Sequence, residues 1–166
     1  LTWKGAEKAA KLVSFANAFD LPVVTLVDVT SYKNTECTES HMPTAAAKLA
    51  YAYANADVPM ITVVKNALGT AGLSFGAKAL GADVVYAFQN SKIGVMDAAQ
   101  AAKVVANGDA DAEKKFASEN TALAAAKRGY VDEIIAPEET RQRIAAALQM
   151  LGYKSVYRPD KKNGTV

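Results

Sequence analysis

Two kinds of hydrophobic pattern alternate along the chain. Small and apolar residues recur at helical spacing over residues 3–20, which predicts an amphipathic helix. β-Branched apolar runs over residues 21–29 and 58–67 predict two buried strands. Between these strands, residues 30–43 are polar and aperiodic and predict a long loop, and a helix is predicted over residues 45–57.

The same alternation of strands and helices continues in the second half. Residues 16–29 and 54–66 also form a weak internal repeat, because each carries Ala-Asn-Ala, an aspartate, an X-Pro pair and then an apolar run. Such alternation predicts one layered α/β domain over residues 1–166, with mostly parallel strands. The later predicted strands span 82–88, 92–96 and 130–136, and the later predicted helices span 97–106, 112–129 and 137–152, with a turn over 107–111.

Composition and charge add few constraints on function. Of the 166 residues, 51% are hydrophobic and 22% are charged, which is an ordinary globular balance. The net charge of +2 gives no general signature of nucleic-acid binding. The single cysteine, Cys37, excludes an internal disulfide and fits a reducing compartment, so we expect a cytoplasmic protein. We expect neither a membrane span nor a signal peptide from the apolar runs.

Three glycines open the helix that is expected directly after the second strand. Gly69, Gly72 and Gly76 each cost about 1 kcal/mol of helix propensity relative to alanine. Two interpretations remain open at this point. The amides of Thr70, Ala71 and Gly72 could face a ligand at the start of the helix, or Gly72 and Gly76 could only permit close packing.

Side-chain chemistry gives weaker candidates. His41 and Cys37 share the polar segment, where they suggest a metal site or a Cys-His nucleophilic pair, although a plain loop histidine fits the sequence better. Ser74, His41 and Asp28 form a conceivable catalytic triad, but no Gly-x-Ser-x-Gly elbow surrounds the serine.

Acidic and phosphate-binding motifs are also weak. Glu36 and Glu39 are expected to be solvated loop residues. The spacing of the segment "GTAGLSFG" differs from the dinucleotide-binding fingerprint, and no Walker lysine follows it.

Four segments together resemble a known family. They are "VTLVDV", the long run from "AKLAYAYANADVP" through "KNALGTAGLSFGAKALGADVVYAFQNSKIGVM", "AAKRGYVDEIIAPEETRQRIAAAL" and the closing "RPDKKNG". In this order they resemble the C-terminal half of the carboxyltransferase component of biotin-dependent acyl-CoA carboxylases. The resemblance implies a crotonase (ClpP-like) fold, a superhelix of repeated β-β-α units with mostly parallel strands.

The resemblance implies an activity and a set of partners. Family members transfer a carboxyl group between N1 of biotin and the α-carbon of an acyl-CoA. The C-terminal half supplies mainly the biotin side, and an N-terminal half or partner chain binds acyl-CoA. The implied cofactor is biotin on a separate carrier, with no metal, and the implied assembly is a homo- or hetero-oligomer without nucleic acid.

The glycine-rich turn carries the implied site. The family pattern there is Gly-Gly-Ala-Tyr, and this chain has Gly69-Thr70-Ala71-Gly72. The resemblance implies that the backbone amides of Thr70 and Ala71 form an oxyanion hole for the biotin ureido oxygen. Gly69, Gly72 and Leu73 are the implied substrate- or biotin-binding neighbours. Thr70 stands where the family has a glycine, which crowds the second amide.

A second departure follows the first strand. Thr30, Ser31 and Tyr32 stand where the family typically has Pro-Gly-Phe, and the following loop is shorter. The implied biotin contacts are carried to these three residues. Two alternatives stay open: a non-catalytic assembly subunit of a carboxyltransferase complex, which this change favours, or another crotonase-fold acyl-CoA enzyme such as a hydratase or thioesterase. No well-placed catalytic glutamate supports the latter.

Overall fold

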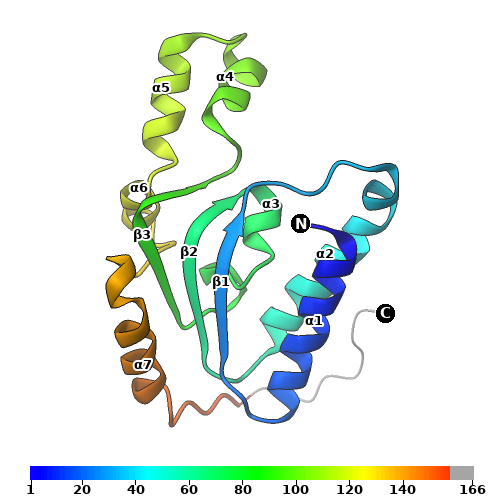
Figure 1. Cartoon of the computed structure of the whole chain (residues 1–166), viewed down its shortest axis with the longest axis vertical. Coiled ribbons are helices and arrows are strands. Elements are labelled where there is room, and N and C mark those ends of the chain that lie inside the picture. Colours follow the sequence, from blue (N-terminus) through cyan, green and yellow to red (C-terminus); the bar gives the residue numbers. More distant parts are fainter. Residues whose placement is uncertain (158–166) are drawn as a thin grey trace.

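A single parallel sheet organises the structure, a computed structural model that describes residues 1–157. The strands lie in the order β1-β2-β3-β4, and every neighbouring pair is parallel (Figure 1). This arrangement confirms the predicted α/β class. The "RPDKKNG" segment of the resemblance lies outside the described residues. The strands are β1 (Val23–Val29), β2 (Met60–Leu68), β3 (Val84–Gly94) and β4 (Glu133–Ile135).

Helices cover both faces of this sheet. Helices α1 and α2 lie side by side against one side, and α7 lies against the other (Figure 1). The helices are α1 (Trp3–Ala18), α2 (Glu36–Asn55), α3 (Gly69–Leu73), α4 (Ala98–Ala106), α5 (Ala110–Glu119), α6 (Ala122–Lys127) and α7 (Thr140–Met150), with 3₁₀ turns η1 (Lys78–Leu80) and η2 (Pro137–Glu139).

The alternating side chains of β2 join the two halves of the core. Val64 packs with Ala125 of α6 in one buried cluster, and Ile61 packs with Ala147 of α7 in another. Because successive strand residues point to opposite faces, β2 is buried on both sides, as its continuous apolar run predicts. A third cluster, centred on Leu49, joins α1 to α2.

The first strand is not buried on both faces, so that prediction is wrong for β1. β1 is an edge strand, and the side chains of Val24 and Leu26 are 41% and 72% exposed. The outer side of α1 is also apolar: Leu12, Phe15 and Phe19 are all more than half exposed. An apolar run alone does not distinguish an edge strand from a central one.

The expected loop over residues 30–43 is wrong from Glu36 onward, because α2 begins there. Thr35 caps the helix, since its hydroxyl accepts a hydrogen bond from the Thr38 amide at 3.3 Å. Pro43 lies inside the helix, where it supplies no amide hydrogen to the preceding turn. Its presence and the polar first turn hide the helical pattern in the sequence.

Two further boundaries differ from the prediction. The strands expected at 82–88 and 92–96 form the single strand β3, whose pairing with β2 shifts from Ala87 to Lys92. The helix expected at 112–129 is divided into α5 and α6. The hydroxyl of Thr121 accepts a hydrogen bond from the Ala124 amide at 3.2 Å and caps α6, which separates it from α5.

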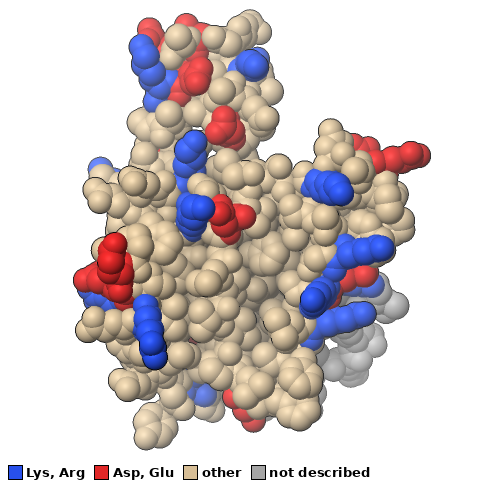
Figure 2. Space-filling view, in the orientation of Figure 1, with Lys and Arg blue, Asp and Glu red and all other residues tan. Residues whose placement is uncertain are grey.

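Helices α4 and α5 form an arm that projects beyond the sheet (Figure 1). The predicted turn between them is confirmed, because Asn107 and Gly108 both have positive φ, at 50° and 84°. Acidic and basic side chains interleave on the arm, and the broad centre of the visible face is nearly free of charge (Figure 2). No basic stripe crosses this face.

Candidate functional site

The glycine-rich turn is built by one backbone conformation. β2 ends at Leu68 in an extended conformation, with φ −112° and ψ 137°, and Gly69 then adopts φ +62°. A Cβ at Gly69 would lie 3.2 Å from the carbonyl oxygen of Val95. Because L-residues rarely adopt this φ, glycine is what permits the direct change from strand to helix.

The next two residues begin α3. Helix α3 has only five residues and no side-chain cap at its N-terminus. The first amides of a helix have no carbonyl partner within it, so the N–H groups of Thr70 and Ala71 are without helical hydrogen bonds. The Thr70 residue is exposed, whereas Ala71 is 2% exposed. The turn therefore supplies two neighbouring donors from the backbone alone.

The other two glycines have packing roles. A Cβ at Gly72 would lie 2.7 Å from the backbone of Ala67, so α3 lies directly on the end of β2. Gly76 has φ +62°, and a Cβ there would lie 2.9 Å from the ring of Tyr53. The hydroxyl of Thr62 donates a hydrogen bond to the Gly76 carbonyl at 2.6 Å. The packing interpretation is thus confirmed for Gly72 and Gly76, and the ligand-facing interpretation of the amides stays a prediction.

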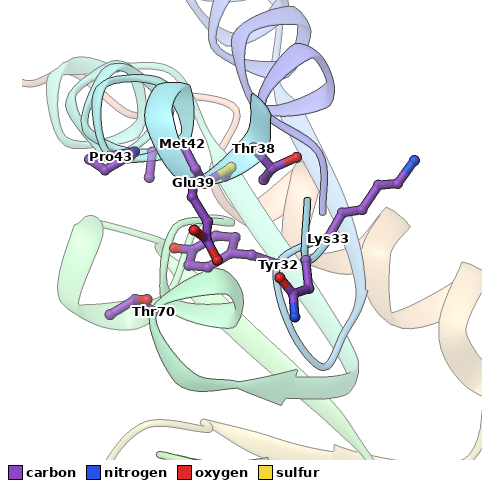
Figure 3. A pocket seen from close by; sticks show the side chains of 9 residues that line it. Tyr32, Lys33, Thr38, Glu39, Met42, Pro43 and Thr70 are labelled. Atoms are coloured by element: carbon purple, nitrogen blue, oxygen red, sulfur yellow. The ribbon is translucent and has the colours of Figure 1, made fainter. Parts of the chain in front are cut away.

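A pocket of about 540 Å³ lies beside this turn. It brings together two of the predicted site residues, Tyr32 and Thr70, from segments far apart in sequence (Figure 3). Its floor is apolar and comes from α2. The lining residues are Tyr32, Lys33, Asn34, Thr38, Glu39, Met42, Pro43, Ala46 and Thr70.

Hydrogen bonds to Leu1 hold Tyr32 in place. The backbone nitrogen of Leu1 donates to the Ser31 carbonyl at 2.8 Å, and the Lys33 amide donates to the Leu1 carbonyl at 2.8 Å. Tyr32 is half-buried and packs against the cluster between α1 and α2. These bonds fix the backbone on both sides of its ring, so one wall of the pocket is defined.

The remaining predicted contacts do not line this pocket. Thr30 and Ser31 are exposed and precede it in the loop. Leu73 is 48% exposed on α3, and Gly72 is buried against β2. Of the three residues after β1, the structure therefore assigns only Tyr32 to the pocket.

The conceivable triad is not assembled. The Ser74 hydroxyl donates to the Thr70 carbonyl at 2.7 Å, and the ring of His41 stacks on Trp3 with centroids 4.8 Å apart. Asp28 instead accepts hydrogen bonds from the side chains of Lys65 and Asn66, at 2.8 and 2.7 Å. These two bonds hold the pKa of the Asp28 carboxyl below its ordinary value.

The side chains of Cys37 and His41 do not form the nucleophilic pair or the metal site that the sequence suggested. Nδ1 of His41 lies 2.9 Å from the backbone carbonyl oxygen of Cys37 and 2.8 Å from the Ser40 hydroxyl, so its contact with Cys37 is through the backbone. Over residues 1–157, no group of three or more His, Cys, Asp or Glu side chains is placed to hold a metal ion.

Sequence reasoning missed the α2 side of the pocket. Thr38, Glu39, Met42 and Pro43 were all within the expected loop, although they line the pocket from a helix. The available signal was Thr35 followed by two glutamates, which is typical of a capped helix start with acidic residues in the first turn.

The chain belongs to the carboxyl transferase domain family, whose model matches residues 1–166. It is 37% identical over 180 residues to a putative propionyl-CoA carboxylase beta chain of Bacillus subtilis, covering 100% of this chain and 36% of that one. It is 40% identical over 173 residues to the methylmalonyl-CoA carboxyltransferase 12S subunit of Propionibacterium freudenreichii, covering 96% and 33%. The chain thus spans about a third of the length of these relatives.

Solved structures agree with this assignment. The transcarboxylase 12S structure with hydrolysed methylmalonyl-coenzyme A, described as a hexamer assembly, has a TM-score of 0.94 and 38% identity, and covers 99% of this chain and 34% of that chain. The beta subunit of Pseudomonas aeruginosa geranyl-CoA carboxylase has a TM-score of 0.85 and 25% identity, with coverage of 99% and 35%. The predicted crotonase fold is confirmed by these carboxyltransferase neighbours.

Within residues 1–157, no helix is both long enough and apolar enough to cross a membrane.

Proposed function

We propose that this chain supplies the biotin side of the active site in a biotin-dependent acyl-CoA carboxyltransferase. The observation that supports the proposal most directly is the turn at Gly69, where the amides of Thr70 and Ala71 have no helical partner and Thr70 lines the same pocket as Tyr32. These are the positions at which the family resemblance implies an oxyanion hole.

The chemistry assigned to the turn is electrostatic. When bound, biotin supplies the ureido nitrogen that carries the carboxyl group to or from the α-carbon of an acyl-CoA. The amides of Thr70 and Ala71 would donate hydrogen bonds to the ureido oxygen of a bound biotin and stabilise negative charge on it, so no side-chain base and no metal is assigned.

The pocket fits a small, mostly apolar ring. Met42, Pro43 and Ala46 form an apolar floor, and the Tyr32 ring forms one wall. Polar side chains from residues 32–34, the first turn of α2 and Thr70 surround this floor and can orient a ligand by hydrogen bonds. Gly69, Gly72 and Leu73 complete the turn, and Thr30 and Ser31 form the approach to Tyr32.

The rest of the machinery belongs to other parts of the protein. We infer that residues 1–166 are a single domain that belongs to one half of a two-domain enzyme, since relatives are about three times longer. An acyl-CoA-binding half or partner chain, a biotin carrier, and assembly into an oligomer complete the proposal. We place this complex in the cytoplasm, where Cys37, which is free and exposed, stays reduced.

The test uses the full-length protein assembled with the acyl-CoA-binding half and a biotin carrier. We expect biotin-dependent decarboxylation of malonyl-CoA or methylmalonyl-CoA. Ala71→Pro, which removes one amide donor, should lower kcat by about 10²-fold. Thr70→Ser, which keeps every amide, should retain activity, and thermal unfolding of both variants controls for misfolding.

Three other results would contradict the proposal. Unchanged activity in folded Ala71→Pro would remove the oxyanion-hole assignment. Hydration of an enoyl-CoA or hydrolysis of an acyl-CoA thioester without biotin would identify the hydratase or thioesterase alternative. A correctly assembled complex that neither turns over nor binds biotin would identify a non-catalytic assembly subunit.

A further inference from the structure

The pocket is lined by two charged side chains, Glu39 and Lys33, to which the proposed function gives no role. Glu39 lies in the first turn of α2 and faces the same space as Tyr32 and Thr70 (Figure 3). Within residues 1–157, no ion pair involves its carboxylate. Lys33 also lines the pocket, but its ammonium group points away from Glu39 (Figure 3).

An uncompensated carboxylate restricts what the pocket can bind. It repels a ligand group that carries negative charge and attracts a group that donates a hydrogen bond. The apolar floor at Met42, Pro43 and Ala46 meanwhile favours a neutral ring over a hydrated cation. The combination fits a neutral cyclic ligand that has an N–H group on one edge and an acceptor oxygen for the turn.

A cyclic urea has this arrangement of groups. Its oxygen accepts hydrogen bonds, and each of its two nitrogens carries a hydrogen that it can donate. When one nitrogen is used for carboxyl transfer, the other N–H remains as a donor. Two hydrogen-bonding sides of the pocket, the Thr70 turn and Glu39, can then fix the ring in one orientation.

We propose that Glu39 is a positioning residue that accepts a hydrogen bond from the non-reacting ureido N–H of biotin. This inference rests on the proposed function. The carboxylate fixes which of the two nitrogens faces the acyl-CoA, while the amides of Thr70 and Ala71 bind the oxygen. Glu39 itself exchanges no proton with the ligand and forms no covalent bond.

Glu36 provides a matched control. It lies in the same first turn of α2, is exposed like Glu39, and does not line the pocket. The two glutamates therefore make similar contributions to the start of the helix. Any difference between their variants reports on the pocket rather than on the stability of α2.

The experiment measures KM and kcat for free biotin as carboxyl acceptor in the assembled full-length complex. We expect Glu39→Ala to raise KM for biotin about 10-fold, which is the loss of one hydrogen bond to a charged acceptor. Glu39→Gln retains an acceptor oxygen and should recover part of this loss. Glu36→Ala and Glu36→Gln should leave KM at the wild-type value.

A modified ligand tests the same contact from the other side. Biotin methylated on the non-reacting ureido nitrogen has no N–H to donate, so wild type should bind it about 10-fold more weakly than biotin. In Glu39→Ala this difference should largely disappear. The measurement still applies if kcat changes, because competition against biotin reports binding directly.

The outcomes separate this inference from the proposed function. If Glu39→Ala and Glu36→Ala give the same KM while wild type is active, the role of Glu39 is wrong and the proposed function stands. If Glu39→Ala discriminates against methylated biotin as strongly as Glu36→Ala and wild type do, the proposed contact between Glu39 and the ureido N–H is also wrong. If wild type shows no biotin-dependent turnover, the proposed function itself is wrong.

Discussion

The hydroxyls of Thr25 and Tyr53 lie 2.9 Å apart in the core and connect β1 to α2. Both side chains are buried, and burial raises the pKa of the Tyr53 phenol. The same Tyr53 ring packs on Gly76, whose carbonyl accepts a hydrogen bond from the Thr62 hydroxyl. One tyrosine thus links the edge strand, the long helix and the segment that follows the glycine-rich turn.

Tyr53→Phe tests this link. It removes the hydroxyl and leaves Thr25 without its partner, so we expect unfolding free energy to fall by about 1–2 kcal/mol in urea titrations. In the double variant Thr25→Val with Tyr53→Phe, neither polar group remains unpaired, and part of the loss should be recovered. Strict additivity of the two single changes would contradict the contact.

Gly72→Ala tests the close packing of α3 on β2. The new Cβ would lie 2.7 Å from backbone atoms of Ala67, which cannot move away as a flexible side chain would. Overpacking of this kind costs about 1–3 kcal/mol, and it should also displace the amides of Thr70 and Ala71 and reduce biotin-dependent turnover. Gly152→Ala, where the nearest atom is 3.4 Å away, is the control that should leave turnover unchanged.

Asp28 predicts a pH dependence of stability. Its pKa is lowered in the folded state, first by the hydrogen bond from Lys65 and then by the bond from Asn66. The stabilisation is therefore present above its unfolded pKa of about 3.9 and is lost as pH falls through the lower folded pKa. Melting temperatures of wild type and Asp28→Asn should differ at neutral pH and converge as the pH falls through the lowered folded pKa of Asp28.

Asp83 and Lys154 form the most enclosed ion pair of the described residues, with side chains 19% and 13% exposed. Lys154 donates to the Asp83 carboxylate at 2.8 Å and to the Val58 carbonyl at 2.9 Å. Lys154→Met leaves the Asp83 carboxylate with the Met60 amide, at 2.8 Å, but without its cation, and we expect a loss of about 2–3 kcal/mol in unfolding free energy. Lys114→Met, in a pair whose side chains are 79% and 89% exposed, should cost less than about 0.5 kcal/mol.

The layered fold was predictable because its strongest patterns are local. The apolar run at β2 and the alternation of strands with helices follow directly from side-chain periodicity. The start of α2 was not predicted, because its cap and first turn are polar and Pro43 interrupts the pattern. The edge position of β1 was not predictable either, since it depends on which strands lie beside it.

The candidate site was likewise predictable only in part. The small residues at 69–72 mark the turn in the sequence, but the sign of φ at Gly69 and the contact of Gly72 with Ala67 depend on tertiary structure. The pocket joins residues 32–34, the first turns of α2 and Thr70. Only folding brings these segments together, so Glu39 had no signal in the sequence beyond its place near a helix cap.

The conformation of Gly69 also limits how this gene can change. Every missense mutation of a glycine codon adds a side chain, and at this position a side chain meets both an unfavourable φ and the Val95 carbonyl. A saturation library selected for turnover should therefore lose all substitutions at codon 69, while codon 152 tolerates several. The turn requires a residue without a chiral Cα at position 69, and glycine is the genetically encoded amino acid that has none.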